Sequence, residues 1–448
     1  MTQLYPIQPQ EFAVESREQT VGGIQYTLQP LSGETFCPLC DSKNILKNGM
    51  RDRFVRDLPE YGSHVGLRIH VQRYRCKDCG NIWTQTFKSI NDRSKMTIRM
   101  RDFIAQRALW NPFDRIAGEL SLSHTTIKNA FLEYVDQLEE NYDLHAPKVL
   151  GIDENHLGGQ YRAIFTDINN RLILDILPKR NKDMVKAWLE SLPDKNNVAC
   201  VTMDMWAPYR DAVREVLPKV PIVIDKFHVI KELNRALEQI RRNLRADMSK
   251  QERSHLRREK YLLLCNAEDL SIEKQDMLYD LFDRYPMFQK PHALKEQFRD
   301  IYLLSKTRAD AERKYYLWVT EAQEIPEYQY LINAIENWHE EIFSYFDHRY
   351  TNAVSETLNN LINQISQRGR GYSFDVLRAK VLFGTKATKP PKFQFKKEPA
   401  PTPAMGYTRP GGHVPHIPQG QPARKQILVH GSGVSIDALE KVIQSGDF

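Results

Sequence analysis

The stretch from residue 198 to residue 230 constrains the fold of this chain more than any other segment. It contains two short apolar runs that each end in a carboxylate: VACVTM leads into Asp204, and VPIVI leads into Asp225. The segment between the two runs has the spacing of one amphipathic helix. Strand, acid, helix, strand, acid is the order of an α/β domain whose functional groups lie at the carboxyl ends of its strands. We therefore expect the chemistry of the protein at this edge of a sheet.

Earlier residues supply the rest of the predicted sheet. A third apolar run ends at Asp153, and two further strands are predicted from Tyr161 to Asp167 and from Arg171 to Leu177. A tight turn at Asn169–Asn170 joins these two strands, and a helix is predicted from Lys182 to Leu192. Three strands, then helix, strand, helix, strand is the order of a ribonuclease H-like domain, whose sheet has an antiparallel half and a parallel half.

Three carboxylates could meet in such a domain. Its first and fourth strands are neighbours, so Asp153 and Asp204 should lie side by side. A third acid would come from a later helix, and the candidate is Glu356, about one turn into a helix that Thr351 or Asn352 caps. Hard cations such as Mg²⁺ prefer carboxylate oxygens, and two of them about 3.5–4 Å apart promote phosphoryl transfer. A surface carboxylate is the simpler interpretation of any one acid, but three at these places favour a catalytic site.

Four of the six cysteines form two matched C-x-x-C pairs. Two such pairs can complete a tetrahedral site for one structural Zn²⁺ ion, so the predicted ligands are Cys37, Cys40, Cys76 and Cys79. A disulfide framework is the alternative. However, the chain has no signal-peptide pattern and no apolar run of about 20 residues that could span a bilayer. These features predict an intracellular protein, in which disulfides are rare.

The region around the cysteines is strongly basic. From Asp41 to Arg107 there are 15 Lys or Arg and 7 Asp or Glu, a net charge of +8 in a chain whose total is +6. A basic module on a balanced body indicates a polyanionic partner. Between the cysteine pairs, arginines alternate with apolar residues, which predicts a β-hairpin with a basic face for DNA phosphates. The candidate contacts are Arg51, Arg53, Arg73 and Arg75; a solvated surface is the alternative.

From Met96 to Asp143 the hydrophobic period changes to about 3.6 residues. It predicts a helix from Thr97 to Trp110, a short helix after Pro112, and a helix from Thr125 to Glu140. A short helix, a tight turn and a longer helix are typical of a helix-turn-helix, whose last helix can enter the major groove of DNA. The candidate DNA contacts are Ser123, His124, Thr125, Lys128 and Asn129. A purely structural three-helix bundle is the alternative.

The chain beyond His228 has no strand pattern. Residues 231–345 predict an all-helical insertion, with helices at Lys231–Met248, Ser254–Leu264, Ile272–Arg284 and Tyr328–Phe346. Its candidate contacts to the DNA backbone are Arg241, Arg242 and Arg245, for which a solvated helix face explains the charges equally well. From Ala387 the composition shifts to Pro, Lys, Gly and Gln, which predicts a disordered tail. A short helix from Gly433 to Gln444 could bind a protein partner at its end.

Several motifs together resemble one family. They are Gly151-Ile-Asp153-Glu154, Asp204-Met-Trp206-Ala-Pro-Tyr209, Asp225-Lys-Phe227-His228, Thr351-Asn352-x-x-x-Glu356-x-x-Asn359-Asn360 and Arg368-Gly-Arg-Gly-Tyr372. In this order, with the cysteine pairs before them, they resemble the ISL3 family of bacterial insertion-sequence transposases over roughly residues 36–386. The resemblance implies a DDE transposase in the bacterial cytoplasm that acts on double-stranded DNA as a homodimer or larger assembly.

The resemblance also implies a mechanism and a set of site residues. Asp153, Asp204 and Glu356 would bind catalytic Mg²⁺ or Mn²⁺, and the enzyme would cut the element ends by hydrolysis before a 3′-hydroxyl attacks the target DNA. Asp225 and His228 resemble a motif that related transposases carry after the fifth strand, and we interpret them as supporting catalytic residues. Asp225 in place of Asp204 as the second metal ligand is the alternative. A catalytically silent DNA-binding regulator and a nuclease without strand transfer are the rival functions.

The sequence therefore predicts a multi-domain α+β protein. The expected parts are an N-terminal segment (1–35), a zinc ribbon (36–95), a helix-turn-helix (96–146), the first part of a ribonuclease H-like core (147–230), an all-helical insertion (231–345), the final core helices with Glu356 (346–386) and the tail (387–448).

Overall fold

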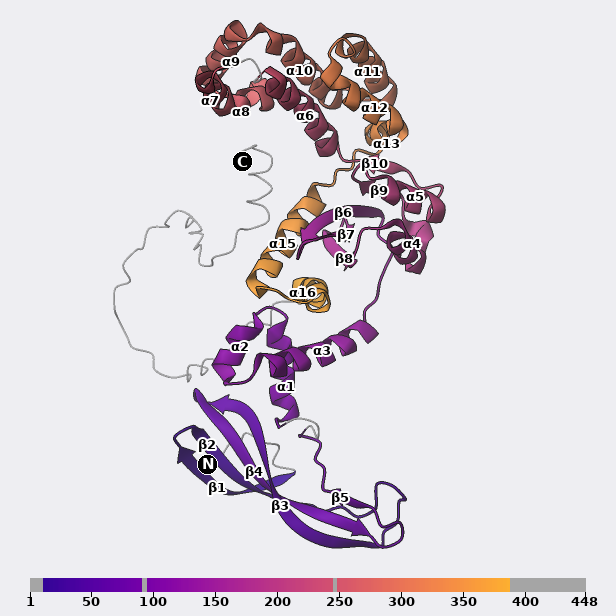
Figure 1. Cartoon of the computed structure of the whole chain (residues 1–448). Coiled ribbons are helices and arrows are strands. Elements are labelled where there is room, and N and C mark those ends of the chain that lie inside the picture. The colour runs from indigo at the N-terminus through magenta and orange to yellow at the C-terminus, as the bar shows by residue number, and fades with distance from the viewer. Residues whose placement is uncertain (1–10, 91–94, 245–247, 387–448) are drawn as a thin grey trace, which may run out of the picture. The chain divides into compact units, whose positions relative to one another are not determined.

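The computed structural model describes residues 11–90, 95–244 and 248–386 (Figure 1). Of these, residues 11–243 and 290–386 form one compact unit, and residues 244–289 form a second. The predicted tail (387–448) with its helix at 433–444, and the candidate DNA contact Arg245, lie outside the described residues. None of the helices in the described ranges has the length and apolar character that a membrane span requires.

The first sheet of the larger unit contains five strands, in the order β1-β2-β4-β3 with β5 paired to β4. They are β1 (Phe12–Thr20), β2 (Gly23–Pro30), β3 (Ile45–Glu60), β4 (Ser63–Cys76) and β5 (Ile82–Thr84). β3 and β4 form the hairpin that the sequence predicts between the cysteine pairs. β2 runs parallel to β4, so the segment before residue 36 supplies two strands to this sheet, which the sequence reasoning did not predict.

Three helices follow: α1 (Ile98–Ala108), α2 (Phe113–Leu120) and α3 (His124–Glu140). Two of their starts are fixed by side chains, since Thr97 accepts a hydrogen bond from the N–H of Met100 and Ser123 accepts one from that of Thr126. α2 ends at Ser121, which adopts a left-handed conformation with φ of 48°. The predicted helices are thus present, within a few residues of their predicted ends.

The second sheet has the order β10-β9-β6-β7-β8. Its strands are β6 (Val149–Leu157), β7 (Gln160–Asp167), β8 (Leu172–Ile176), β9 (Cys200–Met203) and β10 (Ile222–Ile224). β6, β7 and β8 are antiparallel, whereas β9 runs parallel to both β6 and β10. The predicted pairing of the first and fourth strands of this domain is confirmed, because Ile152 on β6 lies opposite Met203 on β9.

Helices cover both faces of this sheet. α4 (Lys182–Ser191) and α5 (Ala207–Val216) share one apolar core with Phe165, whose ring stacks on that of Trp188 with 3.6 Å between centroids. The neighbouring Ile164 points to the other face, where it packs with residues of α15 (Ala353–Gly369) and α16 (Phe374–Lys386). A short 3-10 turn, η1 (Lys195–Asn197), precedes β9. The sheet therefore lies between two helical layers (Figure 1).

Part of the predicted insertion packs with this sheet. Its helices in the larger unit are α6 (Lys226–Leu244), α10 (Gln289–Leu304), α11 (Arg308–Ala322), α12 (Gln329–Asn337), α13 (His339–Phe343) and α14 (Tyr345–His348), with η5 (Pro326–Tyr328). Leu233, Phe298 and Trp318 share the apolar core that contains β9 and β10. The single helix predicted from Tyr328 to Phe346 is interrupted, because Trp338 has a non-helical φ of −121° and ψ of 21°.

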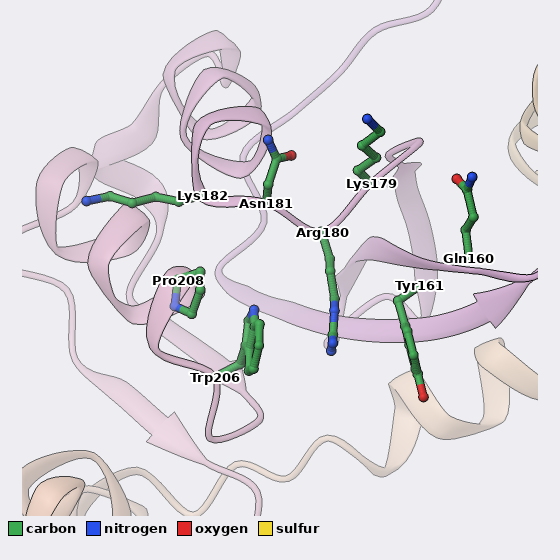
Figure 2. Close-up of a pocket in the computed structure, with 8 residues that line it drawn as sticks. All are labelled: Gln160, Tyr161, Lys179, Arg180, Asn181, Lys182, Trp206 and Pro208. Carbon is green, nitrogen blue, oxygen red and sulfur yellow. The ribbon is translucent and has the colours of Figure 1, made fainter.

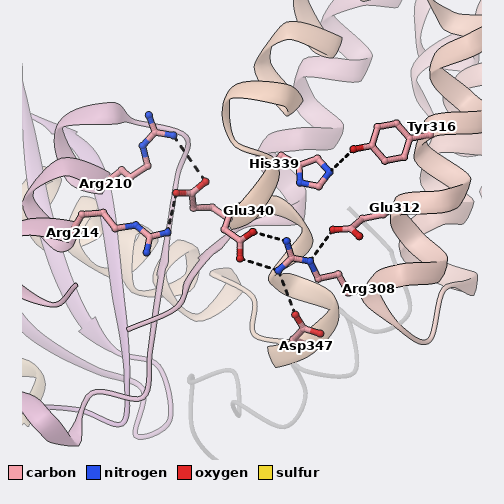
Figure 3. A network of polar contacts seen from close by, with 9 residues as sticks. Arg210, Arg214, Arg308, Glu312, Tyr316, His339, Glu340 and Asp347 are labelled. Carbon is pink, nitrogen blue, oxygen red and sulfur yellow. Dashed lines mark hydrogen bonds and ion pairs between the residues drawn. The ribbon is translucent and has the colours of Figure 1, made fainter. Parts of the chain in front are cut away.

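Ion pairs hold α13 between two other helices (Figure 3). Glu341, only 5% exposed, lies 3.3 Å from Arg214 and 4.0 Å from Arg210, both on α5. On the other side, Arg308 of α11 binds both carboxylate oxygens of Glu340, at 2.9 and 2.6 Å. Bidentate Arg–carboxylate pairs are the stronger and more directional kind, so these contacts fix the helical layer against the end of the sheet.

The smaller unit is helical. It contains α7 (Lys250–Arg258), α8 (Lys260–Leu264), η3 (Ala267–Asp269), α9 (Ile272–Arg284) and η4 (Pro286–Phe288). The helix predicted from Ser254 to Leu264 divides at Glu259 into α7 and α8, whereas the helix predicted from Ile272 to Arg284 has those bounds.

Candidate functional site

Asp153 and Asp204 lie where the parallel pairing of β6 with β9 ends: Asp153 is within β6, and Asp204 directly follows β9. They directly follow Ile152 and Met203, which the register pairs. Asp153 is 5% exposed, and its Oδ1 accepts a hydrogen bond of 2.7 Å from the N–H of Glu154. Burial, and then the negative charge of Asp204, raises the pKa of Asp153 to about 8. The pair therefore carries negative charge that a proton or a bound cation must offset.

His228, in the first turn of α6, lies beside Asp204. Its Nδ1 lies 2.9 Å from Oδ1 of Asp204, an ion-pair distance, although the two atoms are not aligned for a hydrogen bond. Burial acts to lower the pKa of His228, but the carboxylates of Asp204 and Asp225 act against it, and the pKa is raised overall. The structure thus brings the predicted His228 to Asp204.

Asp225 follows β10 and is 3% exposed. Its Oδ1 accepts a 3.3 Å hydrogen bond from the N–H of Phe227, and the backbone of Asn352 also hydrogen-bonds to its carboxylate. Burial raises the pKa of Asp225. Because Asn352 is the residue before α15, Asp225 links the end of the sheet to the start of the helix that carries Glu356.

α15 approaches β6 closely at Gly151. Ser355 on the helix donates a hydrogen bond of 2.6 Å to Oδ1 of Asn352, and its Oγ lies 2.9 Å from Oγ1 of Thr166. A Cβ atom on Gly151 would lie 2.3 Å from that Thr166 oxygen and 2.9 Å from the Ser355 oxygen. Glycine is therefore the residue that lets the helix pack at this distance.

Glu356 and Asn359 face the site from α15. Glu356 lies exposed in the first turn, where desolvation and then the charge of Asp225 raise its pKa. Asn359 donates hydrogen bonds from Nδ2 to Oδ2 of Asp153 at 2.9 Å and to the carbonyl of Glu154 at 3.4 Å. Sequence reasoning included Asn359 only within a motif, although its i+3 spacing from Glu356 places both on one helix face.

The oxygen donors fit a hard divalent cation. Asp153 and Asp204 offer carboxylate oxygens in a region of excess negative charge, and Oδ1 of Asp204 has no aligned donor. Mg²⁺ and Mn²⁺ prefer such ligands. Glu356 is close enough to Asp204 for their charges to interact. Within the described residues, however, the only group of three or more acidic, His or Cys side chains with ligand atoms all within 4.8 Å is formed by cysteines.

That group is the predicted set of Cys37, Cys40, Cys76 and Cys79. The Sγ atoms of Cys37 and Cys79 are 3.7 Å apart, as are those of Cys40 and Cys76. Tetrahedral zinc with Zn–S bonds of about 2.3 Å requires S···S distances of about 3.8 Å. The four thiols therefore fit one structural Zn²⁺ ion.

The predicted basic face lies on the β3–β4 hairpin. The register pairs Arg51 with Val71 and Arg53 with Ile69, and Arg73 and Arg75 continue the same alternation along β4. Arg51, Arg73 and Arg75 are exposed, and Arg53 is partly buried. The four arginines therefore project from one face of the hairpin.

The predicted contacts on α3 are also on the surface. Ser123, His124, Thr125 and Asn129 are exposed and Lys128 is partly buried. In α6, Arg242 is exposed and lies 3.3 Å from Glu238. Arg241 is different: it is 4% exposed and makes two hydrogen bonds of 2.8 and 2.6 Å to Glu238. The sequence-based prediction that Arg241 contacts DNA does not agree with its burial, because an ion pair within the helix turns it inward.

A cavity of about 500 Å³ is lined by Tyr161, Arg180 and Trp206 among others, and the sequence reasoning did not predict it (Figure 2). The guanidinium of Arg180 lies 4.3 Å from the ring centroids of both Tyr161 and Trp206. Arg180 also forms an ion pair with Glu154, the residue after Asp153. Trp206, two residues after Asp204, belongs to one of the motifs found in the sequence.

Comparison with known proteins agrees with this architecture. Residues 150–381, from β6 to α16, match the ISL3-type family described as "Transposase". The chain belongs to the ISL3 family of transposases. Residues 33–79, which include the four cysteines, match the "zinc-finger of transposase IS204/IS1001/IS1096/IS1165". One relative is the transposase for insertion sequence element IS1001 of Bordetella parapertussis, 22% identical over 354 residues, 77% of this chain and 87% of the relative.

Family membership makes this ISL3 chain a DDE transposase, an enzyme that moves DNA, and confirms the resemblance drawn from its motifs. The matched zinc finger and the four-cysteine geometry together support structural zinc in this transposase. Transposase and zinc-finger regions in one chain also imply that it binds DNA.

Proposed function

We propose that this transposase cuts and joins DNA with Asp153, Asp204 and Glu356 as ligands of catalytic divalent cations. The observation that carries the proposal is that buried Asp153 and its neighbour Asp204 directly follow two residues paired between β6 and β9, because a cation would relieve the charge that these carboxylates share. When bound, two Mg²⁺ or Mn²⁺ ions would activate an attacking oxygen and stabilise a leaving oxygen. The order of the second sheet supports a ribonuclease H-like core for this chemistry.

Asp204 is the better second ligand than Asp225. β9, which ends before Asp204, pairs with β6, whereas β10, which ends before Asp225, pairs only with β9. The Asp225 carboxylate already accepts backbone hydrogen bonds from Phe227 and Asn352. Asp225 therefore supports the fold of the site, and His228 offsets part of the charge of Asp204.

The reaction has two steps. In the first, water attacks a phosphodiester at the element end, the bond to the 3′ oxygen breaks, and a 3′-hydroxyl is released. In the second, that hydroxyl attacks a phosphodiester of target DNA and displaces its 3′ oxygen. Asn359 holds Asp153 in place through both steps. Two element ends require at least two active sites, so we propose a homodimer or a larger assembly on DNA.

The N-terminal parts would select the element end. The three helices α1 to α3 support a helix-turn-helix, with the exposed start of α3 in the major groove. The arginine face of the hairpin would contact phosphates. The proposed domains keep their predicted bounds, except that the zinc-binding module includes β1 and β2 and the separate part of the insertion spans 244–289.

The test uses purified full-length protein and duplex DNA from the ends of its own element, with and without Mg²⁺. Asp153→Asn, Asp204→Asn and Glu356→Gln should each abolish nicking and strand transfer while end binding persists. Asp211→Asn, at an exposed acid of α5, is the control and should behave as wild type. Wild-type protein that binds ends but never nicks them would instead support a catalytically silent regulator, and nicking without joining would support a nuclease.

A further inference from the structure

Two residues connect the cavity to the chain segments that carry Asp153 and Asp204. Trp206, which lines the cavity, is two residues after Asp204, and its backbone N–H donates a 2.7 Å hydrogen bond to the carbonyl of Asp204. Glu154 follows Asp153 and pairs with Arg180 in the cavity wall. The cavity therefore lies on the same segments as the two acids, so a DNA strand bound at the acids could also reach it.

Aromatic surface is left open in this cavity. Tyr161 is 50% exposed and Trp206 is 38% exposed, although large aromatic side chains are usually more buried. The planar guanidinium of Arg180 already stacks between them. Nucleobases are also planar and stack on such rings irrespective of sequence. The wall formed by Tyr161, Arg180 and Trp206, the stacking wall, is thus suited to a base.

Positive charge surrounds the stacking wall. Lys179, Arg180 and Lys182 line the cavity (Figure 2). Arg180 is paired with Glu154, and Lys182 lies 2.6 Å from Glu215. Lys179 is exposed on the rim. The combination of cations and open rings suits a phosphate joined to a base rather than a neutral or purely apolar ligand.

We propose that this cavity holds one unpaired nucleotide of the element end, next to the cleaved bond. Its base stacks against the stacking wall, and its phosphate contacts Lys179 and Lys182. A volume of about 500 Å³ is within the range of small-ligand sites and is large enough for one nucleotide. The proposal rests on the proposed function, since it assumes that cleavage occurs at Asp153 and Asp204.

Photochemical crosslinking tests the position of the base. Full-length protein is bound, without divalent cations, to end duplexes that carry 5-iododeoxyuridine at each position around the cleaved bond in turn. The expected result is a crosslink from one position to Trp206 or Tyr161, identified by mass spectrometry of the peptide. Bound DNA that crosslinks to neither ring from any position would overturn the proposal, as would a failure of the protein to bind end DNA.

A matched pair of lysine variants tests the phosphate contact. Lys182 and Lys186 both pair with Glu215, at 2.6 and 2.8 Å, but only Lys182 lines the cavity. Lys182→Ala should weaken end binding several-fold. It should also reduce the slope of the logarithm of the binding constant against the logarithm of salt concentration by about one, the value expected for one phosphate contact. Lys186→Ala should leave both unchanged. Equal losses of DNA affinity in the two variants would overturn the proposal, since they would reflect only the ion pair that each lysine makes with Glu215.

Trp206 variants test the stack. Trp206→Ala should weaken end binding about tenfold, and Trp206→Phe should retain most of the affinity. The loss should disappear on DNA that lacks the base at the crosslinked position. A loss that persists on this abasic DNA would mean that Trp206 serves only the fold. These binding and crosslinking measurements exclude divalent cations, whereas nicking is measured with Mg²⁺. The nucleotide site can therefore be refuted while wild-type protein still nicks DNA, which distinguishes this proposal from the proposed function.

Discussion

Asn359 donates a hydrogen bond to Asp153 across 206 residues of sequence, with 2.9 Å between Nδ2 and Oδ2. The same Nδ2 reaches the carbonyl of Glu154, and Nδ2 of Asn155 donates to the backbone carbonyl of Asn359. These contacts join α15 to the strand that carries the first acid. The position of Glu356 relative to Asp153 therefore depends on them.

Loss of the Asn359 side chain should impair catalysis more than folding. Asn359→Ala frees Asp153 to move, and groups that hold metal ligands typically contribute about 10- to 100-fold to activity or metal affinity. We expect slower single-turnover nicking and a higher Mg²⁺ requirement, with unchanged end binding. Gln364→Ala, at an exposed position further along α15, is the control. An unchanged Mg²⁺ requirement in Asn359→Ala would contradict the positioning role.

Gly151→Ala should destabilise the contact between β6 and α15. The added Cβ would meet Oγ1 of Thr166 at 2.3 Å and Cδ1 of Ile168 at 2.7 Å. Overpacking of this kind costs about 1–3 kcal/mol, which thermal unfolding would detect. Adding Thr166→Ala removes the closest atom and should restore part of the loss. Gly66→Ala on β4, where nothing lies within 4 Å, should have little effect.

Removal of zinc should unfold the tip of the first sheet and weaken DNA binding. Cys40→Ser leaves three thiols, so we expect a large loss from about one zinc per chain, measured by elemental analysis of fresh protein. Cys265→Ser, outside the four-cysteine group, should keep its zinc. Wild-type protein purified without zinc would refute the assignment.

Lys380 should make stability depend on pH. Its Nζ donates to the carbonyls of Ala108 and Asn111 beneath α1, and burial lowers its pKa to about 7. The unfolded chain holds this proton up to about pH 10.4. Between these values the unfolded state binds more protons, so stability should rise with pH, by roughly 2–3 kcal/mol from pH 7 to 9.

Thermal unfolding across this pH range is the measurement. Lys380→Met should remove the rise, whereas Lys148→Met, at an exposed lysine, should keep it. If Lys380→Met and wild type follow parallel pH profiles, the buried amine is not the cause.

The second sheet could be predicted because its signals are local. Apolar runs that end at Asp153, Asp204 and Asp225 indicate buried strands with acids at their ends, and the structure contains these strands. The start of α15 was predictable for the same reason, since Asn352 precedes it. By contrast, the contacts of Asn359 depend on a packing distance across the whole domain, which spacing alone does not determine.

Other features could not be predicted because tertiary contacts decide them. β1 is mostly exposed and polar, and its pairing with β2 identifies it as a strand. Arg241 belongs to a basic run in the sequence, yet Glu238 holds it in a buried position. Arg180 belongs to no motif in the sequence. The two rings beside it, those of Tyr161 and Trp206, come from distant parts of the chain.

The late position of α15 in the chain has a consequence for synthesis of the protein. The cysteine module, the three N-terminal helices and both sheet aspartates precede residue 226, whereas Glu356 and Asn359 follow residue 350. A nascent or truncated chain can therefore possess the proposed DNA-recognition elements, which lie in the first 140 residues, while it still lacks the helix that completes the proposed acid triad. Cutting activity would arise only once α15 has been synthesised and folded, and chains that stop before it would occupy element ends without breaking them.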